Sequence, residues 1–174
     1  MATAPSGYRV ERLGDQHDRT AFSCGVEVLD RYFRTRAGQD SRKRVASCFV
    51  LVAADGSAAG YYTLSASSIA LADLPSNLTR KLPRYPLMPT TLMGRLAVDH
   101  RRRGQRLGEL LLFDAFSRTL RSEIASYAFV VDAKDDAAQT FYERYGFMLL
   151  PSAGRRLFLP LAEIANLFTG RRMG

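Results

Sequence analysis

Residues 101–112, RRRGQRLGELLL, join three consecutive arginines to two glycines at the start of a leucine-rich stretch. The planar fork of arginine suits phosphate oxygens, and Gly104 and Gly108 let the backbone approach a ligand closely. A helix that begins here adds unpaired N–H groups and the positive end of its dipole. The stretch therefore predicts either a pyrophosphate cradle or a basic, solvated turn, and its residues alone favour neither.

Two common phosphate-binding motifs are absent from the sequence. The stretch does not match GxxxxGK[ST], the P-loop of nucleotide triphosphatases, or GxGxxG, the dinucleotide-binding fingerprint. We therefore expect neither a P-loop nor a dinucleotide-binding site at this turn.

The turn needs a strand before it and a helix after it, and the hydrophobic pattern supplies both. Alternation and apolar runs predict strands over 8–13, 47–54, 58–71, 91–99 and 126–133, and then over FMLLP and RRLFLPL. Helical spacing predicts helices over 26–38, 104–124 and 135–146, a short helix and loop within 75–89, and a basic tail at the end. This order predicts a single domain over 1–174 of the α/β or α+β class, with helices against a mixed sheet.

Charge and composition limit the partners. The formal net charge is +8, and only three of the 25 basic residues are lysines. This balance favours a polyanion such as nucleic acid, although a genome rich in arginine codons would produce the same bias. The sequence has no apolar run long enough to span a membrane and no apolar signal segment. With two cysteines and two histidines we expect no metal site and a reducing, cytoplasmic location.

The turn and a later segment, DAAQTFYERYGF, together resemble the acyl-CoA site of the GNAT superfamily of N-acetyltransferases. In that superfamily an Arg/Gln-x-x-Gly-x-Gly/Ala pattern binds the coenzyme A pyrophosphate. Here the pattern falls on Arg103, Gly104, Gln105, Arg106, Leu107 and Gly108. Arg106 stands where the pattern has glycine, so a left-handed backbone at that residue would be strained. The later segment matches the superfamily at Ala138, Phe141, Tyr142, Gly146 and Phe147.

The resemblance implies the GNAT fold, with a mostly antiparallel sheet of roughly six to seven strands that splays at the acyl-CoA site, flanked by about four helices. It implies that backbone groups of Leu96, Ala97 and Val98 pair with the pantetheine amides of acetyl-CoA, as an added strand would. It also implies that Tyr142 protonates the departing sulfur. Spacing alone would favour an aromatic packing role for Tyr142, so the resemblance carries its catalytic role.

The N-terminal half is similar to the acetyltransferase toxins of type II toxin–antitoxin systems. This likeness lies in an F-x-C-G and L-D-x-Y segment, at Phe22, Cys24, Gly25, Leu29, Asp30 and Tyr32. Such toxins acetylate the α-amino group of aminoacyl-tRNA and stop translation. The similarity implies acetyl-CoA, charged tRNA and a ribbon-helix-helix antitoxin as ligands and partners, and a homodimer.

Binding of tRNA requires a basic surface, and several clusters are candidates for it. The residues are Arg34, Arg36, Arg42, Lys43, Arg44, Arg80 and Arg95. Contacts of this kind would bind phosphates without reading sequence. The same cluster over 31–44 would also suit a solvated helix face, and Arg34, Arg36 and Arg42 would equally receive an acidic antitoxin tail.

No residue stands out as a general base. We expect His17 at the surface, His100 in the anion turn, and Asp99 and Glu109 as charge partners of a helix start. A free α-amine has a pKa of about 7.7–8, against about 10.4 for lysine, so the lack of a base favours an α-amine substrate. Two alternatives stay open: a non-toxin N-acetyltransferase acting on a peptide or small-molecule amine, and an acyl-CoA-binding module without activity.

Overall fold

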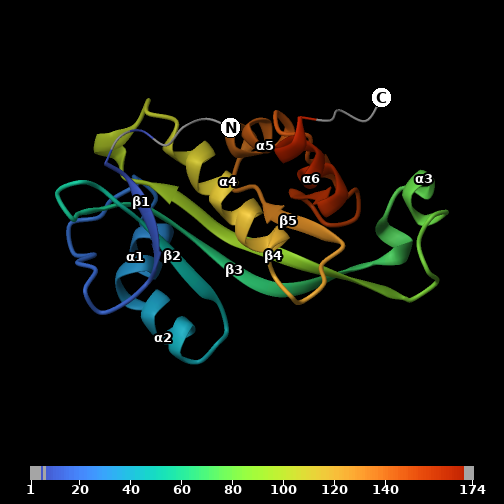
Figure 1. Ribbon diagram of the computed structural model, residues 1–174, viewed down its shortest axis with the longest axis horizontal. Coiled ribbons are helices and arrows are strands. Elements are labelled where there is room, and N and C mark those ends of the chain that lie inside the picture. Colours follow the sequence, from blue (N-terminus) through green and yellow to red (C-terminus); the bar gives the residue numbers. More distant parts are fainter. Residues whose placement is uncertain (1–4, 6, 171–174) are drawn as a thin grey trace. The chain divides into compact units, whose positions relative to one another are not determined.

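The computed structural model describes residue 5 and residues 7–170 of the chain. The chain forms two compact units, Met1–Ser65 with Met93–Ser117 and Ala66–Leu92 with Arg118–Gly174. The long strands β3 (Ala58–Ala70) and β4 (Leu87–Val98) contribute residues to both units (Figure 1). The single domain expected from the sequence stays a prediction.

The described residues form a sheet of seven strands in the order β1-β2-β3-β4-β5-β7-β6. The pairs β1–β2, β2–β3, β5–β7 and β6–β7 are antiparallel. Four of the six α-helices in the described chain have eight residues or more. The mixed, mostly antiparallel sheet with flanking helices expected from the resemblance is thus confirmed.

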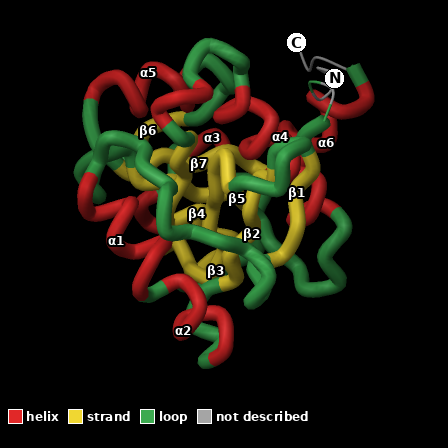
Figure 2. Tube along the Cα trace, turned by 90° about the vertical axis from the view of Figure 1, so that its left-hand side faces the viewer, coloured by secondary structure: helices red, strands yellow, loops and turns green. Residues whose placement is uncertain are grey.

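In the first unit, β1 (Arg9–Arg12), β2 (Ser47–Val52) and β3 carry helices on both faces. Neighbouring residues of a strand point to opposite faces, and Tyr61 and Tyr62 show this directly. The Tyr61 hydroxyl donates to the Leu29 carbonyl on α1 (Glu27–Thr35) at 2.7 Å, and the Tyr62 hydroxyl donates to Asp114 on α4 (Leu107–Leu120) at 2.6 Å. Figure 2 shows α1 and α2 (Ala37–Arg42) on one side of these strands and α4 on the other.

Aromatic rings fill the core between α1 and the sheet. Phe33 stacks on Tyr61 with ring centroids 4.3 Å apart, and Phe22 meets Phe33 edge to face at 4.9 Å. All three residues are buried, together with Ala97 of β4. The first unit therefore fixes the position of the second half of β4 through packing on α1.

The second unit joins the far half of β3 and the near half of β4 to the C-terminal elements. Its elements are η1 (Leu71–Asp73), α3 (Ser76–Thr79), β5 (Ala128–Asp132), α5 (Asp136–Glu143), β6 (Met148–Leu149), β7 (Arg156–Pro160) and α6 (Leu161–Thr169). Its core contains Ile69, Met88, Val130 and Phe158. Among the described residues, no helix is both long enough and apolar enough to cross a membrane.

Several element boundaries differ from the sequence prediction. Strand β4 begins at Leu87 rather than 91 and contains Pro89, which has no N–H to donate. The Pro89 carbonyl accepts the Tyr127 N–H at 2.8 Å. Helix α4 ends at Leu120 rather than 124, so Ile124 lies beyond it and is 83 % exposed. The helix predicted over 26–38 divides at Arg36 into α1 and α2.

One further expectation was wrong. Residues 164–169, taken for part of a basic tail, belong to helix α6, whose C-cap Gly170 is left-handed with φ 70°. Arg171 and Arg172 lie outside the described residues.

Candidate acyl-CoA and catalytic site

Asp99 fixes the turn that follows β4. Its side chain is fully buried, and Oδ1 accepts both the backbone N–H and the Nε–H of Arg101 at 2.9 Å. Its Oδ2 accepts from Arg101 Nη2 at 3.0 Å and from the Ser23 N–H at 3.3 Å. Burial alone would raise the pKa of Asp99, but the hydrogen bonds from Arg101 and Ser23 outweigh it and lower the pKa to about 2.

The three consecutive arginines bind different parts of the first unit. Arg101 and Arg102 belong to the short helix η2 (His100–Arg102). Arg101 binds Asp99, and Arg102 donates to Ser57 Oγ at 2.8 Å. Arg103 donates through Nη2 to the Cys24 carbonyl at 2.9 Å. Each arginine of the run therefore has an acceptor within the first unit, while Arg101 and Arg103 also stay exposed. The role of Arg103 in binding the pyrophosphate stays a prediction.

The backbone of the turn is left-handed at two residues. Gly104 has φ 82° and Arg106 has φ 58°. A β-carbon placed on Gly104 would meet no atom within 4 Å, so the space beside it is open. Because α4 begins at Leu107, its first N–H groups have no partner within the helix and face the end of this turn. Open space, left-handed backbone and a helix start together fit an anion such as the coenzyme A pyrophosphate.

Arg106 has the left-handed backbone that is strained for a residue other than glycine. Its left-handed backbone costs about 1–2 kcal/mol relative to glycine. Its guanidinium is 76 % exposed, and its Nε donates to Glu109 at 2.8 Å. Gln105 is also engaged, since its Oε1 accepts from the Tyr8 hydroxyl at 2.9 Å. The side chains of Arg106 and Gln105 therefore contribute contacts that stabilise the turn.

Strand β4 brings the three predicted pantetheine-binding residues to the same turn. Ala97 is buried on the α1 face, and Leu96 and Val98 are half-buried. The next residue, Asp99, donates its N–H to the Ala59 carbonyl of β3 at 2.8 Å. The pairing of Leu96, Ala97 and Val98 with pantetheine amides, and the splay of β4 from β5, stay predictions.

Tyr142 lies on α5 in the second unit. Its ring is 6 % exposed and meets Phe141 and Phe147 edge to face, with centroids 5.2 and 5.4 Å apart. Helix α5 begins at an N-cap, Asp135, whose side chain accepts the Ala138 N–H at 2.8 Å, and Gly146 follows its end with φ 96°. These caps fix the helical turn that carries the tyrosine.

The Tyr142 hydroxyl has no hydrogen-bond partner among the described residues. Among the described residues, only Ser41 Oγ and Thr90 Oγ1 are side-chain oxygens that are both fully buried and without a partner. The Tyr142 hydroxyl is not one of them, so its oxygen keeps contact with solvent. Burial, with a contribution from Asp132, raises the pKa of Tyr142 above its ordinary value. The phenol is thus neutral at physiological pH and able to donate a proton.

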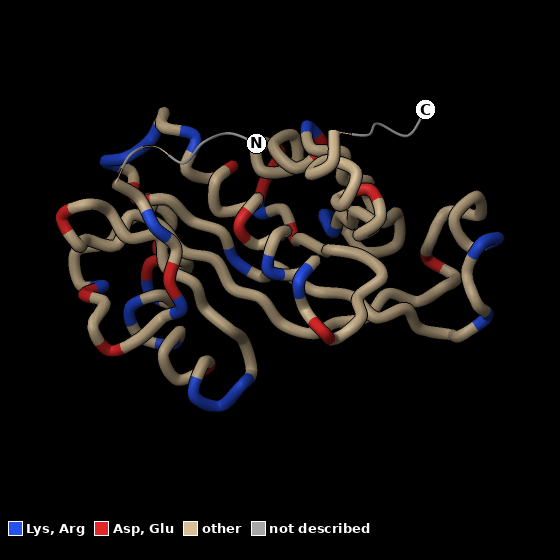
Figure 3. The backbone as a smooth tube through the Cα atoms, in the orientation of Figure 1, with Lys and Arg blue, Asp and Glu red and all other residues tan. Residues whose placement is uncertain are grey.

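The basic residues expected to bind tRNA fall into three environments. Arg36, Arg42, Lys43, Arg44 and, in the second unit, Arg80 are exposed. Figure 3 shows the basic turn after α2 and the basic loop after α3. Arg34 donates to the Phe22 carbonyl at 2.9 Å, so its guanidinium is partly used within the protein. Arg95 is half-buried, and its guanidinium carbon lies 3.4 Å from the centre of the Tyr32 ring.

The side chains considered as bases are held in structural contacts. His17 is buried rather than at the surface: its Nδ1 accepts the Gly14 N–H and its Nε2 lies 3.0 Å from Glu11. His100 donates through Nδ1 to the Ser23 carbonyl at 2.7 Å. Asp99 and Glu109 lie at helix starts, as expected, Asp99 as the N-cap of η2 and Glu109 in the first turn of α4. Both carboxylates also bind arginines.

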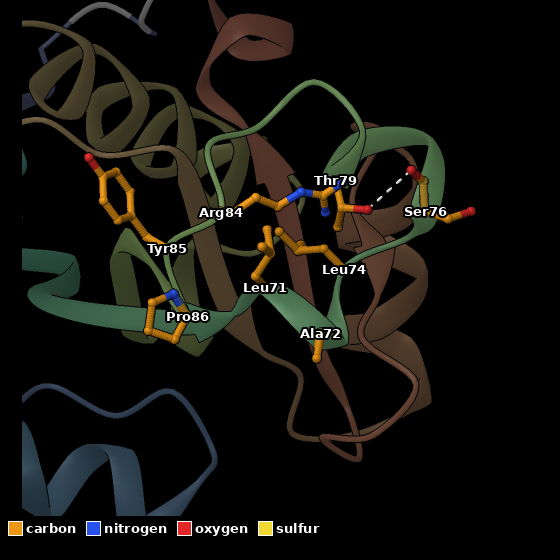
Figure 4. Close-up of a pocket in the computed structure, with 8 residues that line it drawn as sticks. All are labelled: Leu71, Ala72, Leu74, Ser76, Thr79, Arg84, Tyr85 and Pro86. Carbon is orange, nitrogen blue, oxygen red and sulfur yellow. Dashed lines mark hydrogen bonds between the residues drawn. The ribbon is translucent and has the colours of Figure 1, made fainter.

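One pocket was not anticipated from the sequence. It has a volume of about 570 Å³ and lies in the second unit, within the segment from η1 to the start of β4. Figure 4 shows Leu71 and Leu74 beneath the Arg84 side chain, with Thr79 donating to the Ser76 carbonyl beside them. The predicted cofactor-binding residues do not line this pocket. The sequence gives no signal for this pocket, because two leucines three residues apart are as typical of a loop packed on a core as of a pocket lining.

Comparison with known proteins also identifies an acetyltransferase domain in this chain. The model of the "Acetyltransferase (GNAT) domain" matches residues 90–156, which include most of β4, the turn and α5. The "tRNA-acetylating toxin" of Mycobacterium tuberculosis is 37 % identical over 161 residues, which cover 91 % of this chain and 95 % of that protein.

Solved structures extend the similarity to the fold. AtaT complexed with acetyl-methionyl-tRNAfMet matches with a TM-score of 0.82 and 31 % identity, over 92 % of this chain and 99 % of that one. A tyrosine-to-phenylalanine mutant of AtaT bound to the C-terminus of the antitoxin AtaR and to acetyl-CoA matches with a TM-score of 0.76 and 27 % identity, over 94 % and 99 %.

Proposed function

Because the chain belongs to the GNAT acetyltransferase family, we propose that it transfers the acetyl group of acetyl-CoA to the α-amino group of an aminoacyl-tRNA. Acetylation removes the nucleophile that peptide-bond formation requires, so the product cannot accept a peptide and translation stops. The observation that carries the proposal is the environment of Tyr142, a buried ring whose hydroxyl has no partner among the described residues. The relative named as a tRNA-acetylating toxin supports the choice of substrate.

The residues of the first unit bind and polarise the acyl donor in this proposal. The N–H groups at the start of α4 and the backbone of Gly104 and Arg106 receive the pyrophosphate. The backbone of Leu96, Ala97 and Val98 holds the pantetheine, and one of these N–H groups donates to the thioester oxygen, where negative charge develops during attack. Acetyl-CoA supplies the activated acetyl group.

Tyr142 completes the transfer by supplying a proton. The amine nitrogen forms a bond to the acetyl carbon, the carbon–sulfur bond breaks, and the amine loses one proton to solvent. Tyr142 donates its phenolic proton to the departing sulfur and recovers one from solvent. A general acid of this kind contributes about 10²–10⁴-fold to the rate.

Among the residues that the structure describes, we identify no dedicated base, and this agrees with an α-amine substrate. An α-amine has a pKa of about 7.7–8, and esterification of the adjacent carboxyl lowers it further, so a large fraction is neutral at physiological pH. The carboxylates nearest the turn are bound to arginines, Asp99 to Arg101 and Glu109 to Arg106. A lysine substrate would need a base that these residues do not provide.

The partners follow from the exposed basic residues. Arg36, Arg42, Lys43 and Arg44 give the first unit a surface for tRNA phosphates, and Arg80 adds charge to the second. An antitoxin with an acidic tail would cover the same residues, and a ribbon-helix-helix protein is the partner we expect. Charged tRNA is a cytoplasmic substrate, so the proposal places the protein in the cytoplasm. The homodimer stays a prediction.

Incubation of bulk charged tRNA with isotopically labelled acetyl-CoA tests the proposal. Mass spectrometry should find the label on the α-nitrogen of one or more amino acids, and Tyr142→Phe should lower the rate by about 10²–10⁴-fold without weakening acetyl-CoA binding. Label on a peptide or small amine but not on tRNA would support the non-toxin alternative. Binding of acetyl-CoA without transfer to any amine would leave only a binding module.

A further inference from the structure

Arg95 is held against an aromatic ring by its own unit. Its guanidinium carbon lies 3.4 Å from the centre of the Tyr32 ring, a close cation–π contact. Tyr32 is only 7 % exposed, and its hydroxyl donates to Asp40 Oδ2 at 2.9 Å. The Tyr32 ring is therefore held by the Arg95 guanidinium at its face and by Asp40 at its hydroxyl. The ring in turn orients the plane of the guanidinium.

The stacked guanidinium has no hydrogen-bond acceptor or ion-pair partner within the described chain. This separates it from Arg34, which donates to the Phe22 carbonyl, and from Arg103, which donates to the Cys24 carbonyl. Stacking uses the face of a guanidinium and leaves its five N–H groups at the edge. A half-buried guanidinium without an acceptor loses hydration without compensation, so the arrangement suits an acceptor from outside the chain.

The position of Arg95 on β4 indicates which ligand that acceptor belongs to. Arg95 directly precedes Leu96, Ala97 and Val98, and the strand runs from them into the turn at 103–108. If the pyrophosphate lies at the turn and the pantetheine lies along 96–98, then residue 95 is at the thioester end. Side chains alternate along a strand, so Arg95 shares the α1 face with Ala97, which packs in the same cluster as Tyr32.

We infer that Arg95, stacked on Tyr32, binds the phosphodiester that precedes the aminoacylated terminal nucleotide of tRNA. The inference rests on the proposed function, since it assigns a specificity residue to that reaction. This phosphodiester is the anion of the substrate closest to the reactive amine, and the guanidinium edge matches two phosphate oxygens. Tyr32 is a positioning residue, which acts by holding Arg95.

The test uses kinetics on two substrates that differ in one charge. One is aminoacyl-tRNA, and the other is the same molecule with a neutral methylphosphonate at the terminal linkage. Arg95→Ala should lower kcat/KM on the natural substrate by roughly 10- to 100-fold, the loss of a charged hydrogen bond. On the methylphosphonate substrate the variant and the wild type should be equal, because the interacting charge is already absent.

Matched variants separate positioning from folding. Arg12→Ala is the control, because Arg12 also lies over a ring, 6.0 Å from the centre of Phe49, but has an acceptor within the protein, Ser47 Oγ at 3.3 Å. Tyr32→Leu should reproduce part of the loss, on the natural substrate alone, while Tyr32→Phe should retain most of the activity because the ring remains. Calorimetry with acetyl-CoA should give the wild-type affinity for every variant.

Three outcomes would overturn the inference. Equal losses on the two substrates would show that Arg95 does not act through this phosphate, and a matching loss of acetyl-CoA affinity would assign Arg95 to the acyl donor. Unchanged kinetics of Arg95→Ala on a tRNA that the wild type acetylates would defeat this inference alone, whereas a wild type inactive on every aminoacyl-tRNA would defeat the proposed function as well.

Discussion

Gly60 on β3 lies so close to β4 that a β-carbon added to it would come within 2.9 Å of the Ala97 carbonyl oxygen. The same β-carbon would lie 2.9 Å from Leu111 Cδ1 on α4. No flexible side chain can absorb the first of these contacts, because the obstructing atom belongs to the backbone. The closeness of the two strands therefore depends on the absence of a side chain at residue 60.

Gly60→Ala should destabilise the protein by about 1–3 kcal/mol, the usual cost of overpacking. It should also weaken acetyl-CoA binding, because β4 must shift at Ala97, one of the residues proposed to hold the pantetheine. Urea denaturation and calorimetry measure the two effects. Gly94→Ala is the control for stability, since its nearest neighbour would be Thr63 Oγ1 at 3.5 Å, an ordinary contact. Equal stability of the two variants would contradict the argument.

Asp99→Asn should lower the free energy of unfolding at pH 7 by about 2 kcal/mol or more, because the neutral amide cannot accept all the bonds from Arg101 and Ser23. The hydrogen bonds lower the pKa of Asp99 in the folded protein to about 2, below its value in the unfolded chain. The stabilisation is therefore complete above about pH 5 and is lost as the pH falls towards 2.

Urea denaturation between pH 7 and pH 3 checks this pH dependence. The difference between the wild type and Asp99→Asn should shrink as the pH falls. Asp15→Asn, a change at an exposed position of the same unit, should differ from the wild type by less than about 0.5 kcal/mol throughout. A constant difference for Asp99→Asn would mean that the charge of the carboxylate does not carry its contribution.

Patterns of local sequence were sufficient for much of the fold. The hairpin of β2 and β3, strand β5 and helix α5 follow from alternation, an apolar run and capping residues, each within a few neighbouring positions. Helix α6 had similar signals, because Leu161 and Ile164 follow Pro160 at helical spacing and Gly170 ends the helix. The arginines beyond Gly170 are typical of a basic tail, and they favoured that prediction over a helix.

Contacts between distant residues could not be predicted in this way. The stack of Arg95 on Tyr32 and the bond from Arg103 to Cys24 join positions far apart in the sequence, and no local pattern encodes them. The burial of His17 depends on Glu11 and Gly14, which are near in sequence, but only the folded loop shows that they enclose the ring. Nor does a local pattern show that each of the three consecutive arginines binds an acceptor elsewhere in the first unit.

Arg106→Gly should be more stable than Arg106→Ala by about 1 kcal/mol, because only glycine adopts φ 58° without strain. Both variants lose the guanidinium and its contact with Glu109, so the comparison isolates the backbone. Thermal or urea unfolding measures the difference. On strand β1, where φ is not positive, Arg12→Gly should instead be less stable than Arg12→Ala. The same order at both positions would argue against strain at residue 106.

The exposed basic turn after α2 should determine part of the salt dependence of tRNA binding. Each phosphate contact releases counterions, so removal of one contact lowers the slope of log affinity against log salt concentration by about 0.7–0.9. Arg42→Gln and Lys43→Gln together should therefore weaken binding of bulk tRNA and reduce this slope by roughly 1.5. Fluorescence anisotropy over a salt series measures both quantities.

Arg121→Gln provides the control for this last measurement, because Arg121 is exposed beyond the end of α4 and its loss changes the net charge without touching the turn. It should leave the slope unchanged if phosphates contact specific residues. A reduction of the slope in proportion to net charge, wherever the charge is removed, would show that the whole positive surface attracts tRNA. In that case the residues after α2 would form no binding site of their own, and tRNA would be positioned by contacts nearer the acyl donor.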